Sequence, residues 1–129
     1  MHFQIQNPQA QLVTIMHGEI FDVVIDLRLE SRTFGKWFGV ELGENKPRQI
    51  YTPPGFAHGF CVLTDFVDLH YKVSREYCEN DEGGLNWNDP ELGINWPLKT
   101  PLVSGRDANY PFLKSLSIKD LPQKLSLNK

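Results

Sequence analysis

A histidine stands just after a proline-glycine turn in the stretch TPPGFAHGFCVL, residues 52–63. The side chain of His58 could bind a metal ion, act as a general base, or lie in the core without doing chemistry. A nucleophilic pair with Cys61 is excluded, because this odd spacing would place the two side chains on opposite faces of a strand. Cys61, within the apolar run GFCVL, is instead expected to be a buried thiol that packs as a small hydrophobe.

The same stretch matches P-x-G-x-x-H, the second half of the signature of cupin barrels, through Pro53, Gly55 and His58. In metal-binding cupins this histidine is one ligand, and an H-x-H pair and a glutamate upstream are its partners. The remaining histidines are His2, His17 and His70. Their spacing supplies no H-x-H pair, whereas a transition-metal site needs three or four converging ligands. The sequence therefore predicts a cupin barrel without a metal ion and without a cofactor.

Short runs of β-branched and aromatic residues surround this histidine and are separated by turn signals. The runs span residues 11–16, 20–27, 34–42, 48–51, 59–63 and 67–73. Runs of this length and spacing indicate an antiparallel sandwich or barrel. Alternation within 20–27 gives one wholly apolar face and one mixed face, and the mixed face carries Ile20, Asp22, Val24 and Asp26. The mixed face fits either the wall of a polar pocket or a surface in contact with solvent.

The chain of 129 residues is predicted to form a single domain over residues 1–129, with 113–129 as a C-terminal tail. In that tail, SLSIKDLPQKL could form one short helix that Pro122 breaks. The net charge is −3, and the sequence contains no basic stripe. Neither nucleic acid nor an anionic membrane is therefore expected as a partner. The apolar runs are too short to span a bilayer, and the polar N-terminus is unlike a signal peptide. With only two cysteines, these features predict a cytoplasmic protein with reduced thiols.

A set of segments that occur in a specific order carries a wider resemblance. The segments are HFQ (2–4), GEIFDVVIDLR (18–28), TFGKWFGVEL (33–42), PPGFAHGF (53–60), YK (71–72), GLNWNDPELGINWP (84–97) and GRD (105–107). From residue 2 to about residue 112 the sequence closely resembles the dTDP-4-dehydrorhamnose 3,5-epimerases, metal-free cupins of nucleotide-sugar metabolism. The resemblance implies an all-β, cupin-type double-stranded β-helix, that is a jelly-roll barrel, which assembles as a homodimer.

The family inverts the stereocentres on either side of the C4 ketone of a dTDP-4-keto-6-deoxyhexose. This chemistry needs a base that removes the α-proton, a group that stabilises the enolate oxygen, and an acid on the opposite face. The resemblance implies that His2 is the catalytic base and that Asp107 pairs with it and orients it. It also implies that Tyr71 is the proton donor.

The resemblance further implies a set of substrate-binding residues. His58 matches a histidine of the substrate pocket, Tyr77 an aromatic ring that stacks on the thymine, and Glu82 and Arg106 match binding positions. Gln11 stands where the family has a lysine that helps to hold the enolate charge. An amide can donate a hydrogen bond but carries no charge, and losing one preorganised donor typically costs about 100- to 1000-fold in rate.

Taken without the resemblance, these residues favour other interpretations. Tyr71 would be a core tyrosine with a hydrogen-bonded hydroxyl. Asp107 would be a turn residue, and His2 would be disordered beside the chain terminus. Tyr77 and Glu82 would lie on the surface of a loop.

Three functions are therefore in competition. The first is an epimerase that acts at C3, C5 or both centres of a dTDP-4-keto-6-deoxysugar. The second is a non-catalytic cupin that binds nucleotide sugars, since the family has more chain before the histidine. That upstream part includes the arginine of an R-G-x-H motif, and Met1 occupies the x. The third is a related one-centre epimerase or keto-isomerase.

Overall fold

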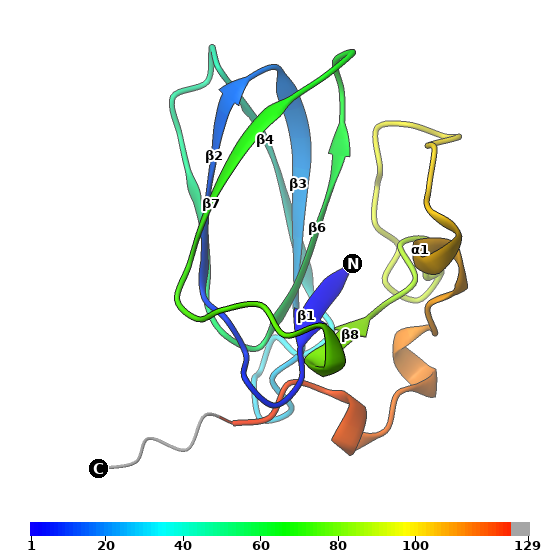
Figure 1. Ribbon diagram of the computed structural model, residues 1–129. Helices are drawn as coiled ribbons and strands as arrows, with labels where there is room; N and C mark the ends of the chain where they lie inside the picture. Colours follow the sequence, from blue (N-terminus) through cyan, green and yellow to red (C-terminus); the bar gives the residue numbers. More distant parts are fainter. Residues whose placement is uncertain (125–129) are drawn as a thin grey trace.

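The computed structural model describes residues 1–124, which form two antiparallel β-sheets packed face to face (Figure 1). The strands are β1 (His2–Gln4), β2 (Gln11–His17), β3 (Glu19–Asp26), β4 (Trp37–Gly43), β5 (Ile50–Thr52), β6 (Phe56–Val62), β7 (Asp68–Val73) and β8 (Glu82–Gly84). The larger sheet has the order β4-β3-β6-β1-β8, and the smaller has the order β5-β2-β7. The predicted all-β jelly-roll architecture is confirmed, and each predicted run overlaps one of the strands.

Strand β3 lies between β4 and β6 in the larger sheet, and both of its faces are covered by other parts of the chain. One face, with Val23 and Ile25, packs under the N-terminal strand and the C-terminal segments. The other face, with Ile20 and Val24, packs against the smaller sheet. Asp22 is fully buried on this second face. The mixed face is therefore a wall between the two sheets, and the interpretation of a solvent-exposed face is wrong.

Asp26, at the end of β3, anchors the loop over residues 27–36. Its carboxylate accepts hydrogen bonds from Arg28 Nε at 2.9 Å and Nη2 at 2.7 Å, from Ser31 Oγ at 2.6 Å and from Thr33 Oγ1 at 2.6 Å. Burial works against the charge, but these hydrogen bonds outweigh burial and hold the pKa of Asp26 well below its usual value. A single buried carboxylate thus organises the loop that follows β3.

The two strands that the sequence did not reveal are β1 and β8. Strand β1 lies between β6 and β8, and His2 is directly opposite both His58 and Gly84. Without the resemblance, His2 was expected to be disordered. That expectation is wrong, because backbone pairing with strands on both sides holds this residue in place. Phe3 of the same strand is buried in the core. A terminal segment is therefore ordered by the tertiary contacts that its own short sequence does not indicate.

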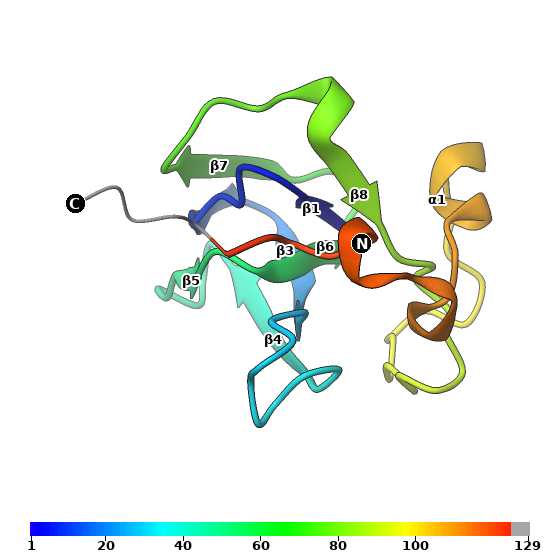
Figure 2. The ribbon, with the colours of Figure 1, turned by 90° about the horizontal axis from the view of Figure 1, so that it is seen from below.

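The C-terminal part of the chain carries little regular structure and covers the outer face of the larger sheet (Figure 2). The short helix expected within 115–125 is a one-turn 3₁₀-helix, Ile118–Asp120, which ends before Pro122. The α-helix α1 spans Gly105–Asn109, where a turn was expected. Residues 125–129 of the predicted tail lie outside the described residues. Within residues 1–124, no helix is long and apolar enough to cross a membrane.

Candidate active site

A cavity of about 980 Å³ opens between the sheets and continues toward the segment before α1. Most of the predicted site residues line it, and they come from both sheets and from the C-terminal part. The lining members of that set are His2, Gln11, His58, Tyr71, Tyr77, Glu82 and Asp107. Arg106 does not line the cavity, but its Nη1 lies 3.3 Å from Glu82 Oε1 at the rim. The fold therefore gathers residues that are far apart in the sequence around one space.

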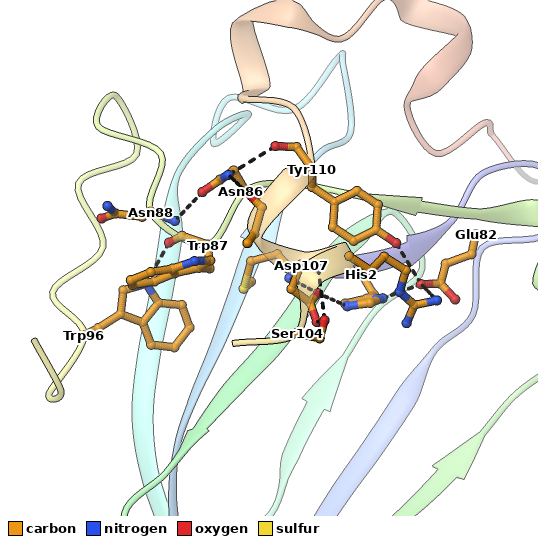
Figure 3. A network of polar contacts seen from close by, with 12 residues as sticks. His2, Glu82, Asn86, Trp87, Asn88, Trp96, Ser104, Asp107 and Tyr110 are labelled. Atoms are coloured by element: carbon orange, nitrogen blue, oxygen red, sulfur yellow. Dashed lines mark hydrogen bonds and ion pairs between the residues drawn. The ribbon is translucent and has the colours of Figure 1, made fainter. Parts of the chain in front are cut away.

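His2 lies between two carboxylates (Figure 3). Its Nε2 is 2.5 Å from Asp107 Oδ1, and its Nδ1 contacts Glu82 Oε1. A neutral imidazole has one N–H donor, so the two contacts can be hydrogen bonds at the same time only when the ring is protonated. For His2 to accept a proton from a substrate, one of the two carboxylates must give up its contact.

Glu82 is the more enclosed of the two carboxylates, with a side chain only 8% exposed. It accepts hydrogen bonds from the hydroxyls of Tyr77 and Tyr110, the latter at 3.0 Å. Burial opposes its charge, but the hydrogen bonds from Tyr77, His2 and Tyr110 prevail and lower its pKa. Glu82 belongs to β8, so the interpretation as loop surface is wrong for it, whereas Tyr77 is exposed as expected.

Asp107 lies in the first turn of α1, and the cap of that helix holds it. Ser104, the N-cap residue, accepts a hydrogen bond from the Asp107 backbone at 3.1 Å and donates its hydroxyl to Asp107 Oδ2 at 2.6 Å. Partial burial alone would raise the pKa of Asp107. The hydrogen bonds from Ser104 and His2 act in the opposite direction and outweigh burial, so the pKa of Asp107 is lowered. The interpretation as a turn residue is wrong, since a capped helix presents this carboxylate to His2.

A second histidine–carboxylate pair, His58 and Asp22, lies between the sheets. His58 Nε2 is 2.8 Å from Asp22 Oδ2, and both residues are buried. The ring of Tyr71 meets the His58 ring edge-on at 5.9 Å between centroids. This arrangement places one further histidine, with its charge partner, deeper in the cavity than His2.

Tyr71 extends into the cavity from β7 and is 40% exposed. Among residues 1–124 its hydroxyl makes no hydrogen bond, so the prediction of a core tyrosine with a bonded hydroxyl is wrong. Burial of the ring, and secondarily the charge of Asp22, raise the pKa of Tyr71 to about 12. The phenol therefore keeps its proton at neutral pH and is available as a donor.

The wall of the cavity includes two buried polar atoms without a partner among the described residues. They are Gln11 Oε1 and Thr52 Oγ1. Gln11 and Thr52 are directly opposite each other on β2 and β5, so their side chains point to the same side of the smaller sheet. Buried polar groups are normally satisfied, so these atoms are positioned to meet a polar group that enters the cavity.

Several residues of the site were missed by sequence reasoning. Ser104 could have been found, because the pattern Ser-x-x-Asp in SGRD is a typical helix start. Tyr110, whose hydroxyl donates a hydrogen bond to Glu82, lies in no local sequence pattern that would have predicted this contact. Cys61 was expected to be buried, but it is only half-buried and lines the cavity.

Within the described part of the chain, no group of three or more His, Cys, Asp or Glu side chains is arranged to hold a metal ion.

Comparison with known proteins gives consistent matches. The family model of dTDP-4-dehydrorhamnose 3,5-epimerase matches residues 1–115. A protein of that name from Shigella flexneri is 44% identical over 110 residues, which cover 84% of this chain and 61% of the relative. A dTDP-4-dehydrorhamnose 3-epimerase from Streptomyces niveus is 44% identical over 108 residues, 83% of this chain and 52% of the relative.

A solved structure matches over nearly the whole chain. The dTDP-6-deoxy-D-glucose-3,5-epimerase of Legionella pneumophila, in complex with dTDP-4-keto-L-rhamnose, superposes with a TM-score of 0.90 at 41% identity. The match covers 95% of this chain and 66% of that one. The chain thus spans less than two thirds of the length of each of these relatives. It belongs to the dTDP-4-dehydrorhamnose 3,5-epimerase family.

Proposed function

We propose that this chain epimerises a dTDP-4-keto-6-deoxyhexose at a carbon next to the C4 ketone. The observation that carries the proposal is the position of His2 and Tyr71. They line one cavity but come from different sheets, His2 from β1 and Tyr71 from β7. Inversion of a stereocentre requires that the proton leaves from one face and returns on the other, which a base and an acid on opposite walls can provide.

In the proposed reaction, His2 takes the α-proton, and the electron pair of the broken C–H bond moves toward the C4 oxygen to form an enolate. Asp107 stabilises the imidazolium that results, because a nearby carboxylate favours the charged ring. Tyr71 then gives its hydroxyl proton to the same carbon from the opposite face. His2 returns its proton to solvent and Tyr71 regains one, so the enzyme ends unchanged and no oxidation takes place.

Binding of the substrate is assigned to residues around this pair. The amide of Gln11 donates to the enolate oxygen in place of the family's lysine, and His58 holds the sugar. The exposed ring of Tyr77 stacks on the thymine, next to Glu82 and Arg106 at the rim. The complex of the Legionella relative with dTDP-4-keto-L-rhamnose supports a nucleotide sugar as the ligand class.

A one-centre reaction is the second candidate. The Streptomyces niveus relative is named as a 3-epimerase, at the same identity as the Shigella 3,5-epimerase. Both reactions use the same base and enolate chemistry, so the number of centres depends on how the sugar sits in the cavity.

Homodimer formation and a cytoplasmic location remain predictions that light scattering and cell fractionation would test.

The proposal is tested by proton NMR of dTDP-4-keto-6-deoxyglucose in D₂O with the purified protein. Loss of the C3 or C5 proton signal above a no-enzyme control is expected, and the signals lost identify which centres react. Calorimetry with dTDP is run in parallel. Binding of dTDP without any exchange over a day would contradict the enzyme and favour a non-catalytic nucleotide-sugar-binding protein.

A further inference from the structure

Tyr110 lies directly against the proposed base, although the sequence resemblance assigned it no role. Its ring meets the His2 ring edge-on, with centroids 5.3 Å apart and an interplanar angle of 85°. Its hydroxyl donates to Glu82 Oε1 at 3.0 Å, and this is the same oxygen that contacts His2 Nδ1. Tyr110 therefore touches both the imidazole and the carboxylate that holds it (Figure 3).

Gly84 provides the space for this ring. It is paired with His2 across the ladder between β1 and β8. A Cβ atom at Gly84 would lie 2.3 Å from Tyr110 Cζ, well inside van der Waals contact. The tyrosine ring thus rests on the strand next to the base, and the missing side chain at Gly84 makes the contact with Glu82 geometrically accessible.

The two carboxylates that flank His2 are held with different firmness. Glu82 lies on a strand, is 8% exposed, and is contacted by two tyrosine hydroxyls and by Arg106. Asp107 is 26% exposed, belongs to a helix of only five residues, and is contacted by Ser104 and by the amino group of Met1. The contact between Nδ1 and Glu82 is therefore the more constrained one, and the contact between Nε2 and Asp107 is the one free to open for a substrate.

We propose that Tyr110 is a positioning residue for His2. By holding Glu82 against Nδ1, it keeps the neutral imidazole in the tautomer that carries its proton on Nδ1 and leaves Nε2 as the basic nitrogen. The orienting role that the resemblance gives to Asp107 then belongs to the Glu82–Tyr110 pair, while Asp107 stabilises the protonated ring. The catalytic part of this inference rests on the proposed function, whereas the tautomer does not.

Tyr110 is suited to a donor role. Burial, followed by its hydrogen bond to Glu82, raises its pKa to about 12. The phenol therefore keeps its proton at neutral pH. Loss of the hydroxyl alone would leave Glu82 with one fewer donor on the oxygen that faces His2.

The test compares wild-type protein with Tyr110→Phe by ¹⁵N NMR of histidine-labelled samples, with the His2 signals assigned by their loss in His2→Asn. Tyr51→Phe, on the exposed face of β5 and outside the cavity, is the matched control. In wild type and in the control, neutral His2 is expected to show the Nδ1–H pattern. In Tyr110→Phe the Nε2–H fraction is expected to rise.

Kinetics supply the second readout. Misplacement of a catalytic group by about 1 Å can cost about 100-fold, so kcat of Tyr110→Phe is expected to fall about 10- to 100-fold. KM is expected to change less than about threefold, because Tyr110 does not line the cavity. An Nε2–H tautomer in wild type, or a tautomer that Tyr110→Phe leaves unchanged, would overturn the inference even if the protein is an active epimerase. A tautomer shift in an inactive protein would refute the proposed function and leave the positioning role standing.

Discussion

The molecule contains two histidine–carboxylate sites of different character. His58 is buried between the sheets and contacts one carboxylate, Asp22. His2 has a side chain 33% exposed at the mouth of the cavity and contacts two carboxylates, one on a strand and one on a short helix. Residue type alone therefore does not assign the chemistry of the two sites. Exposure and the freedom of one partner to leave favour His2 as the candidate base, whereas the enclosure of His58 favours its proposed role of holding the substrate.

Replacement of each histidine by asparagine is expected to separate the two sites most strongly. A general base typically contributes about 100- to 10,000-fold, so His2→Asn is expected to lower kcat by that range. His58→Asn is expected to act mainly on KM, with a smaller loss in kcat, because the ring contacts substrate without taking a proton. Steady-state kinetics of both variants check this. Equal losses of kcat would mean that the two sites share the proton transfer.

Asp26 offers a fourth carboxylate for comparison, and it does not line the cavity. In Asp26→Asn, an amide replaces a carboxylate that accepts four side-chain hydrogen bonds, including two from Arg28. Hydrogen bonds to a charged group contribute about 1.5–3 kcal/mol, so the free energy of unfolding at pH 7 is expected to fall by about 2–3 kcal/mol. Denaturant unfolding measures this change, with Asp68→Asn on the surface as the control.

The pH dependence follows from the lowered pKa of Asp26. A carboxyl whose pKa is lower in the folded state binds more protons when unfolded, so its stabilisation is present above the unfolded pKa of about 3.9. That stabilisation is lost as the pH falls toward the folded value. Wild type is therefore expected to lose stability more steeply than Asp26→Asn below about pH 4. Parallel curves for the two proteins would contradict the assignment.

Gln11 allows a gain-of-function test within the same cavity. The amide can donate to an enolate oxygen, but it lacks the positive charge of a lysine. Since one preorganised donor typically contributes about 100- to 1000-fold, Gln11→Lys is expected to raise kcat about 10-fold or more, with the full gain limited by desolvation of the new charge. Gln11→Met, of similar volume, serves as the control without a donor. If the lysine variant is no faster than wild type, Gln11 does not face the enolate.

The sequence predicted the barrel well because the central strands carry strong local signals. Alternation in 20–27 and the proline-glycine turn before His58 place β3 and β6 without tertiary information. Strand β1 has only three residues and is ordered by its partners on both sides, so no periodicity could reveal it. The same applies to Tyr110, which reaches Glu82 only because the C-terminal chain returns to β8. Residues whose role depends on contacts distant in sequence were found by family resemblance or not at all.

The most direct test of the account separates proton removal from proton return. With Tyr71→Phe in D₂O, His2 can still remove the α-proton, and the enolate can take deuterium back from the same face. We therefore predict continued exchange of the substrate's α-proton without formation of the inverted product, whereas His2→Asn abolishes both. Exchange that persists in His2→Asn, or inversion that continues at the wild-type rate in Tyr71→Phe, would contradict a base and an acid on opposite walls of this cavity.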